Sequence, residues 1–329
     1  MTLPDVAIPL GEEAAEEAFG ALLDGAVADE EIARFLVDLS DRGESAAEIA
    51  GAARAMRSRM VPIAAPAGAI DVCGTGGDGH HTLNVSTAVA LVVAACGVPV
   101  AKHGNRAASS KAGAADTLEA LGLNLDRAAE TAEATLGDLG IAFLFAQRHH
   151  PAMARIMPIR KALGRRTIFN LMGPLANPAG VTRQLIGIAR PAYVPIYADA
   201  LARLGTERAM VVSGDEGLDE LSLAGGNEVA EVGPDGHAVQ RKWAADAGLP
   251  TSPLEALRGG DAAFNAAALR RLLLGETGAY RDAVLFNSAA ALLVAGEVAD
   301  WPEGVEEAAE ALDKGLANTL LDCWIAATR

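Results

Sequence analysis

A glycine-rich loop has the composition of a phosphate-binding site. The loop, GTGGDG at residues 74–79, follows an apolar run at 69–73 that we expect to be a β-strand, and an apolar helix is expected over 86–96. Glycines lack a Cβ, so a phosphate can approach their backbone N–H groups closely, and the helix adds the positive end of its dipole. Asn84, Ser86 and Thr87 offer an amide and two hydroxyls at the helix start, although one such residue alone would be an ordinary N-cap.

The surroundings of this loop argue against a dinucleotide-binding fold. GTGGDG formally matches G-x-G-x-x-G, but such a fold begins its helix within the loop and places an acidic residue at the end of the next strand. Here the helix begins several residues late, and the next expected strand, residues 98–102, ends in Lys102. Lys102 and Arg106 add positive charge in the segment KHGNR. Loop, helix start and basic segment together predict a polyphosphate site.

A second candidate site is acidic. Residues 213–222, SGDEGLDELS, follow an expected strand over 209–214, so they lie at the carboxyl end of a strand, where α/β sheets bind ligands. Asp219 and Glu220 are hard oxygen donors suited to Mg²⁺, which often bridges to substrate phosphates. An acidic pair alone would more simply be a solvated turn. Beside a predicted polyphosphate site, metal binding is the better interpretation.

The distribution of charge also favours an anionic ligand. Residues 139–198 contain no Asp or Glu but eight Lys or Arg, and residues 79–115 also lack acids, in a chain of formal net charge −16. Such windows predict a concave anion site, with a positive outer face as the alternative. The net charge itself argues against nucleic acid and anionic membranes as partners.

Length and composition indicate a globular protein of about two domains. The chain has 329 residues, of which 51% are hydrophobic, and three widely spaced cysteines that form neither a disulfide framework nor a zinc site. Its first residues carry acids where a signal peptide needs basic residues, and its longest apolar run, 88–101, contains Pro99 and is too short to span a bilayer. We therefore expect a cytoplasmic location.

The elements that position these sites change character along the chain. The first sixty residues are expected to be helical, with an apolar stripe of Ile32, Phe35, Leu36 and Leu39 that could pack within the monomer or against a second copy. The sequence SAAE at 45–48 predicts a capping box that opens the next helix. Prolines and glycine over 62–68 then mark a boundary.

Beyond this boundary the chain predicts a parallel sheet. Strand, glycine loop, helix and strand form a βαβ unit, and a further candidate strand lies over 283–286. Four of the six histidines form the adjacent pairs His80–His81 and His149–His150, which we expect to be polar loop residues or helix-end groups. His103 lies inside the basic segment, and it is the histidine that we expect to lie in the reactive part of the site.

Seven motifs in series resemble anthranilate phosphoribosyltransferases. They are GTGGD at 74–78, NVST at 84–87, KHGNRAASS at 102–110, PIR at 158–160, RTIFN at 166–170, GPLANP at 173–178 and GLDE at 217–220. The resemblance implies an α/β protein with a small N-terminal helical domain over 1–66, joined by part of about 155–185, and a large domain over 67–329 with a mainly parallel central sheet. It also implies similarity in fold to nucleoside phosphorylases, an active site between the domains and a homodimer through the helical domain.

The resemblance further implies transfer of the 5-phosphoribosyl group of phosphoribosyl pyrophosphate to the amine of anthranilate, in tryptophan biosynthesis, with two Mg²⁺ ions per monomer. The implied contacts of phosphoribosyl pyrophosphate are Gly74, Gly77, Asp78, Thr82, Asn84, Val85, Ser86, Thr87, Lys102, His103, Gly104, Asn105, Arg106, Ala107, Ala108, Ser109, Ser110 and Ala114. Those of anthranilate are Gly74, Asn105 and Arg160, and the metal ligands are Ser86, Asp219 and Glu220. Lys102, Arg106 and His103 are the catalytic candidates.

Three residues depart from the family pattern. Ala114 stands where a serine is frequent, Leu83 replaces a common phenylalanine, and Gln147 replaces a frequent proline. Two alternatives share the fold, a pyrimidine nucleoside phosphorylase and a non-catalytic nucleic-acid-binding paralogue. The pair Asp219–Glu220 argues against metal-independent phosphorolysis, and the net charge argues against binding of nucleic acid.

Overall fold

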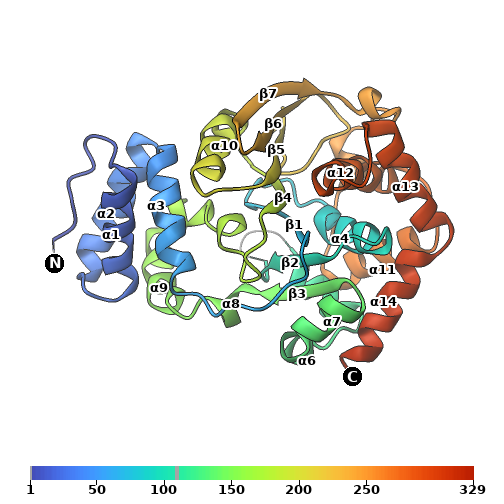
Figure 1. Ribbon diagram of the computed structural model, residues 1–329, viewed down its shortest axis with the longest axis horizontal. Helices are drawn as coiled ribbons and strands as arrows, with labels where there is room; N and C mark the ends of the chain where they lie inside the picture. The colour runs from blue at the N-terminus through green and yellow to red at the C-terminus, as the bar shows by residue number, and fades with distance from the viewer. Residues whose placement is uncertain (1, 108–110) are drawn as a thin grey trace.

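The computed structural model describes residues 2–107 and 111–329. A group of helices at one end of the molecule lies beside a seven-stranded sheet, and further helices cover the opposite side of the sheet (Figure 1).

The helices are α1 (Glu12–Leu23), α2 (Asp29–Arg42), α3 (Ala46–Arg57), α4 (Val85–Ala95), α5 (Ala114–Ala120), α6 (Leu125–Glu130), α7 (Ala132–Asp138), α8 (Ala146–His149), α9 (Met153–Leu163), α10 (Val194–Arg203), α11 (Ala262–Leu273), α12 (Ala279–Ala295), α13 (Trp301–Asp313) and α14 (Leu316–Ala327). The strands are β1 (Ile70–Gly74), β2 (Val100–Gly104), β3 (Ile141–Phe145), β4 (Arg183–Gly187), β5 (Arg208–Gly214), β6 (Asn227–Gly233) and β7 (Gly236–Lys242). Short 3₁₀ turns are η1 (Ile168–Asn170), η2 (Pro174–Ala176), η3 (Pro191–Tyr193), η4 (Ala244–Ala247) and η5 (Leu254–Leu257).

The N-terminal helices form a bundle with its own capping and packing. The predicted capping box of α3 is present, with Ser45 and Glu48 exchanging side-chain and backbone hydrogen bonds. The apolar stripe of α2 is buried inside the monomer, where Phe35 contacts Phe19 of α1 edge-on. The stripe therefore needs no second copy to cover it. Helix α9 contacts α1 and α2, so residues distant in sequence complete the bundle.

The sheet has the order β3-β2-β1-β4-β5-β6-β7. Pairing is parallel from β3 to β5 and antiparallel for β6 and β7, which confirms a mainly parallel sheet. Successive strand residues face opposite layers. Leu185 packs into the core that contains α4 and α12, while Ile186 packs into the core shared by α10 and the N-terminal helices.

The expected strand over 283–286 is wrong, because these residues lie in the middle of helix α12. Most of α12 is buried on all sides, including Ala283, Val284, Leu285 and Phe286. A helix buried all round has no apolar stripe to reveal its period, and a four-residue apolar run alone does not distinguish it from a buried strand. The strands expected at 69–73, 98–102 and 209–214 are present with shifts of two residues or fewer.

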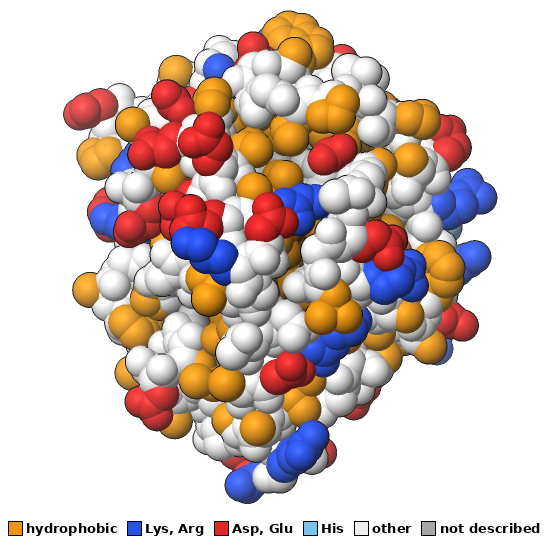
Figure 2. All heavy atoms as spheres, turned by 90° about the vertical axis from the view of Figure 1, so that its right-hand side faces the viewer, with side chains coloured by type: hydrophobic (Ala, Val, Ile, Leu, Met, Phe, Trp, Pro, Cys, Tyr) orange, Lys and Arg blue, Asp and Glu red, His pale blue; other side chains and the backbone are white. Residues whose placement is uncertain are grey.

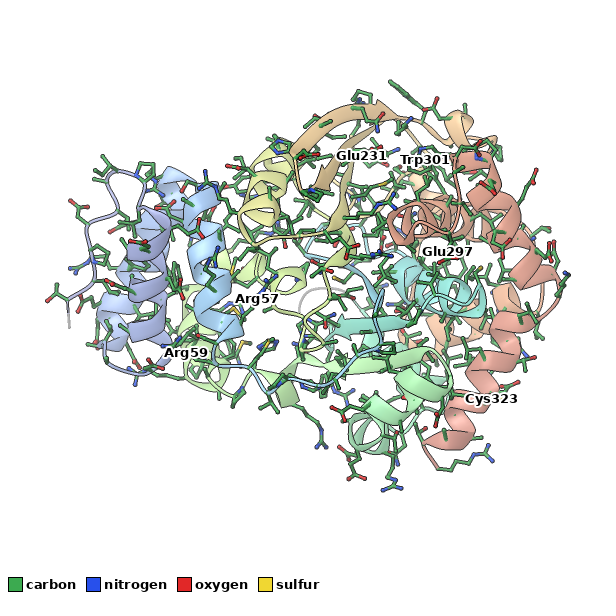
Figure 3. All side chains as sticks on the ribbon, viewed as in Figure 1. Arg57, Arg59, Glu231, Glu297, Trp301 and Cys323 are labelled. Carbon is green, nitrogen blue, oxygen red and sulfur yellow. The ribbon has the colours of Figure 1, made fainter. Side chains whose placement is uncertain are left out.

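Arg57 connects the bundle with the sheet domain. It lies near the end of α3, on the side toward the sheet, whereas Arg59 lies closer to α1 (Figure 3). Arg57 Nε donates a hydrogen bond to the Leu175 carbonyl at 2.6 Å, and Arg59 pairs with Asp24 of the bundle. Neighbouring arginines thus hold the bundle together and fix it to the segment that contains η2.

Charges of both signs are interspersed over the face shown in Figure 2, with acidic groups more frequent in its upper part. All three cysteines are free thiols. Within the described ranges, each helix is too short or too polar to traverse a lipid bilayer.

Candidate active site

The candidate site lies where the order of the strands reverses. The chain places β2 and β3 on one side of β1 and β4 to β7 on the other. In open α/β sheets, ligands bind outside the carboxyl ends of the strands at such a reversal. Gly74 is the last residue of β1, so the glycine-rich loop leaves the sheet at this point.

Two glycines let the acidic loop lie directly on the strand ends. A Cβ at Gly74 would lie 2.3 Å from Asp219 Oδ2, and a Cβ at Gly187, the last residue of β4, would lie 1.6 Å from the Asp219 carbonyl oxygen. Both distances are far below van der Waals contact, so a side chain at either position would displace the loop. The loop that follows β5 therefore reaches across β4 to the end of β1.

The two acidic residues among the predicted metal ligands contact the predicted phosphate-binding segments. Asp219 Oδ2 accepts a hydrogen bond from Gly76 N at 2.6 Å, and Glu220 Oε1 accepts one from Ser86 N at 3.2 Å. Burial, followed by the neighbouring Asp78 carboxyl, raises the pKa of Asp219. Burial, followed by Asp219, raises the pKa of Glu220. A bound divalent cation would relieve this repulsion and stabilise the ionised forms.

These groups fit Mg²⁺ that is shared with a substrate. Within the described parts of the chain, no three His, Cys, Asp or Glu side chains are arranged to hold a metal ion by themselves. Mg²⁺ is commonly bound by one or two carboxylates, water and substrate phosphates, so a complete protein cage is not required. The Ser86 hydroxyl lies beside this pair and accepts a hydrogen bond from Lys102 Nζ at 3.3 Å.

Asn287 fixes the acidic loop by hydrogen bonds to the backbone of Leu221, and no sequence motif indicated this role. Its Oδ1 accepts a hydrogen bond from Leu221 N at 2.9 Å, and its Nδ2 donates to Leu221 O at 3.1 Å. Asn287 is fully buried in α12, the helix whose centre was expected to be a strand. Asn287 was missed because residues 283–286 were expected to form a strand, whereas it is the helix that places the Asn287 amide next to the acidic loop.

Lys102 and His103 lie next to each other in β2 and serve opposite sides of the sheet. Lys102 is buried, and its Nζ donates to the Val72 carbonyl at 2.7 Å as well as to Ser86. Successive side chains of a strand point to opposite faces. His103 accordingly lies away from the metal pair, with its Nδ1 2.9 Å from the Gly173 carbonyl.

A buried carboxylate behind these residues was also missed. Asp71 of β1 accepts hydrogen bonds from His103 N at 3.0 Å and from Asn177 Nδ2 at 2.8 Å. Asn177 also donates to Ala101 O at 2.8 Å. Burial raises the pKa of Asp71, and Lys102 opposes this effect. One acid inside the apolar run IDVC was the available signal, since a buried charge needs partners.

A cavity of about 430 Å³ lies on the His103 side of β2. Its lining contains three predicted substrate contacts, His103, Asn105 and Arg160, together with His150 and an apolar wall. That wall includes Met56, Met153, Met157, Met172 and Phe169. Gln147, the departure from the family's proline, lies at the same cavity. An apolar cavity with one arginine suits a flat organic acid.

Arg160 is the cation of this cavity. Its Nη2 lies 3.4 Å from Asn170 Oδ1, and its guanidinium carbon lies 5.8 Å from the centre of the Phe169 ring. Burial lowers the pKa of Arg160, which has no carboxylate partner among the described residues. A partly desolvated guanidinium with free donors can take a carboxylate in bidentate fashion.

His150 is a site residue that sequence reasoning missed. It is buried, and its Nε2 lies 3.3 Å from His103 Nε2. It lies at the end of α8, as expected for a loop or helix-end residue, but its contact with His103 of β2 was not expected. Nothing in the sequence shows that contact. His149 faces elsewhere, with its Nδ1 2.9 Å from the Val61 carbonyl.

Arg106 is not brought together with Lys102 and the metal pair. It forms ion pairs with Asp116 at 2.9 Å and Glu119 at 2.5 Å, and its side chain is 43% exposed. The acid-free window ends just before Asp116, so the sequence did show these acids, but not that helix α5 turns them back onto Arg106.

The other predicted contacts lie around the same crevice or support its shape. Asn84 Oδ1 accepts hydrogen bonds from Thr117 and Asn265, at 2.6 and 2.9 Å, so this amide is fixed by the protein itself. The Thr87 hydroxyl is buried without a hydrogen-bond partner in the described part of the chain. The remaining positions are Gly77, beside Arg166; Thr82, bridged to Arg258; Val85, in the core; Gly104, against Phe143; Ala107, bonded to Asp116; and Ala114, at the start of α5. Ala108, Ser109 and Ser110 lie outside the described residues.

Comparisons with known proteins identify relatives along the whole chain. Residues 67–318 match the α/β domain of a glycosyl transferase family, and residues 8–60 match the helical bundle domain of that family. The chain is 79% identical to an anthranilate phosphoribosyltransferase of Novosphingobium aromaticivorans, over 99% of this chain and 98% of the relative. A crystal structure of the Thermus thermophilus enzyme of that name matches with a TM-score of 0.91 and 46% identity, over 98% and 97% of the two chains. The Saccharomyces cerevisiae enzyme in complex with phosphoribosyl pyrophosphate and Mg matches with a TM-score of 0.86 and 28% identity, over 97% and 93%.

The buried histidine pair makes stability depend on pH. Burial lowers the pKa of His150 to about 4 and that of His103 to about 3, so between pH 6.5 and 4 the unfolded chain binds more protons than the folded one. The free energy of unfolding therefore falls as the pH decreases through this window. For His150 the loss by pH 5 amounts to about 2 kcal/mol.

We expect His150→Gln to lose about 2 kcal/mol less stability than the wild type between pH 7.5 and pH 5. Urea unfolding at both pH values measures the difference. His237→Gln, at an exposed position, is the matched control and should follow the wild type. Equal losses for wild type and His150→Gln would contradict the assignment.

Proposed function

The chain belongs to the anthranilate phosphoribosyltransferase family, and we propose that the crevice at the ends of β1, β2 and β4 is where its reaction takes place. The enzyme transfers the 5-phosphoribosyl group of phosphoribosyl pyrophosphate to the amine of anthranilate and releases pyrophosphate, a step of tryptophan biosynthesis. One observation carries the assignment of the site. The carboxyl end of β2 lies between a group of phosphate and metal ligands and an apolar cavity that contains an arginine.

The donor substrate would occupy the side with the glycine loop. Lys102 Nζ and the N–H groups of residues 77–79 would meet its phosphates, and Asp219, Glu220 and Ser86 would hold Mg²⁺. When bound, Mg²⁺ offsets the negative charge of pyrophosphate. Arg106 would join this group only after its side chain leaves Asp116 and Glu119, so we assign the main cationic role to Lys102.

The acceptor would occupy the cavity on the other side of β2. Arg160 would pair with the anthranilate carboxylate, and the methionine-rich wall and Phe169 would cover the ring. Asn105 lines this cavity and Gly74 ends β1 under Asp219, and we propose that both substrates reach these two residues. In this placement the acceptor amine would face the ribose, because Lys102, on the donor side, immediately precedes His103, which lines the acceptor cavity.

The difficult step is departure of the leaving group rather than activation of the nucleophile. An aryl amine is uncharged near neutral pH, so its lone pair is available. Loss of pyrophosphate places positive charge on the sugar and negative charge on the leaving group. Fixed donors aimed at the developing anion are the strongest means of lowering such a barrier. Lys102 and the backbone amides of the loop would supply them, with Gly76 N exchanging the Asp219 carboxylate for a phosphate oxygen.

We also propose the finer properties that the resemblance implies. They are two Mg²⁺ ions per monomer, a homodimer through the helical domain, a cytoplasmic location and a division between domains near residue 66. The several phosphate oxygens of the donor support the use of two ions. The dimer rests on the resemblance alone, because the apolar stripe of α2 is already covered inside the monomer.

The reaction is tested by mixing the purified protein with anthranilate. We expect anthranilate fluorescence to fall when phosphoribosyl pyrophosphate and Mg²⁺ are both present, and to stay constant when either is omitted. Thymidine with phosphate is the control for the alternative phosphorolysis and should not be consumed. Constant fluorescence with the complete mixture would exclude the proposed reaction.

Arg160→Ala should weaken binding of anthranilate selectively. Loss of a charge-assisted contact should raise the KM for anthranilate by a factor that corresponds to about 2 kcal/mol, with the KM for phosphoribosyl pyrophosphate nearly unchanged. Arg155→Ala is the matched control, because Arg155 is on the same helix but bonds to Val27 and Asp29 of the bundle. An unchanged KM for anthranilate would remove Arg160 from the acceptor site.

The double variant Asp219→Asn with Glu220→Gln keeps shape while it removes charge. We expect turnover to fall by roughly 10²-fold or more, since a preorganised charge stabiliser is lost. Part of the loss should be recovered at high Mg²⁺, because a weakened site still fills by mass action. Removing two repelling carboxylates should leave the melting temperature close to that of the wild type. Identical Mg²⁺ titrations for both proteins, or a collapse of thermal stability, would show that this pair is structural.

A further inference from the structure

The acceptor cavity contains a pair of imidazoles that the steps above do not use. His103 from β2 and His150 from the turn after α8 are both buried, with ring centres 5.2 Å apart and Nε2 atoms 3.3 Å apart. Both residues line the cavity that contains Arg160. Neither ring contacts Asp219, Glu220 or Ser86, so the pair belongs to the acceptor side.

The hydrogen bonds of the two rings fix where their protons lie. The Gly173 carbonyl can only accept, so the His103 nitrogen beside it, Nδ1, carries a hydrogen. His150 is bonded in the same way to the backbone carbonyl of Ala176. Because its Nε2 faces His103, Nδ1 is the nitrogen available for that bond. Two neutral rings held in this way present two Nε2 lone pairs to each other, with no hydrogen between them.

One proton between the two Nε2 atoms of His103 and His150 would stabilise their contact. Facing lone pairs at 3.3 Å repel, whereas a single proton between them turns the contact into an N–H···N hydrogen bond. The groups around the pair do not provide that proton at neutral pH. His149 and Lys102 oppose a further positive charge on His103, Asp71 is engaged by backbone and amide donors, and Arg160 lies in the same cavity. The pair is therefore neutral before the reaction and has a place for one proton.

The reaction releases one proton on this side of the site. The amine nitrogen forms a bond to C1′ of the ribose, and the C1′–O bond to pyrophosphate breaks with its electron pair remaining on pyrophosphate. The nitrogen, which gained a fourth bond, must lose a hydrogen ion. An arylammonium ion of this kind is a stronger acid than imidazolium. A proton taken up by one ring is also held by the facing Nε2 lone pair of the other, which offsets the effect of burial on the two histidines.

On the basis of the proposed function, we propose that the facing Nε2 atoms of His103 and His150 accept the proton that the anthranilate amine loses on bonding to C1′. The position of β2 places them for this task. His103 follows Lys102 of the donor side along β2 and lines the acceptor cavity, so an amine held in that cavity and facing the ribose would lie near this ring. After product release the proton passes to water in the open cavity.

His150→Gln tests the pair without emptying the cavity, because glutamine can form hydrogen bonds but takes up no proton near neutral pH. With saturating phosphoribosyl pyrophosphate and Mg²⁺, we expect the single-turnover rate to fall by about 10²-fold, as for loss of a general base. Affinity for anthranilate, measured by its fluorescence on titration, should change little. His149→Gln is the matched control, since it alters the neighbouring buried histidine, and should retain the wild-type rate.

Chemical rescue separates proton acceptance from a structural role. His150→Ala leaves a space for a small base, so added imidazole should restore part of the single-turnover rate, in proportion to its unprotonated fraction. A wild-type rate in His150→Gln, or a slow His150→Ala that imidazole does not accelerate, would overturn the proposal. If His150→Ala fails to fold, the rate of His150→Gln decides. Wild-type enzyme that consumes no anthranilate in this assay would instead refute the proposed function itself.

Discussion

The close approach of the Asp219 loop to the sheet is the constraint on which the site depends. It exists because Gly74 and Gly187, at the ends of adjacent strands, have no side chains to occupy that space. Once the loop lies there, its carboxylates meet the amides of the glycine loop and of the start of α4. The glycine loop, the acidic loop and the start of α4 thus meet at the ends of the strands. Asn287 of α12 holds the acidic loop in this position through its hydrogen bond with Leu221.

The second feature is the division of the site by a single strand. Alternation of side chains along β2 sends Lys102 to one side and His103 to the other, so two substrates with different chemistry meet at one backbone. Asp71 keeps this strand end in place, because it bonds to the backbone of His103 and to the Asn177 side chain. A buried carboxylate with these donors positions the site without touching either substrate pocket.

Sequence reasoning found the parts of the site that lie in continuous motifs. The glycine loop, the basic segment and Asp219–Glu220 are short runs whose composition shows their chemistry, and the strands beside them are apolar runs with clear ends. It failed where the information lies in contacts between distant segments. The pairing of His103 with His150, the bond from Asn287 to Leu221 and the return of Asp116 onto Arg106 each need a tertiary fold that no local pattern specifies. The error at α12 has a different cause, because burial of most of its residues on all sides removed the periodic signal.

The hydrogen bonds of the acidic pair explain why phosphate and metal ion belong together at this site. Gly76 N and Ser86 N, which the loop and helix offer to a phosphate, are satisfied here by Asp219 and Glu220. A phosphate that took these donors alone would deprive two half-buried carboxylates of them beside a new negative charge, which is costly. A divalent cation removes that cost, because it gives the carboxylates a new partner and binds the phosphate as well. On the proposed function, the charge of the acidic pair would therefore disfavour binding of the metal-free donor and favour binding of the donor together with its metal ion.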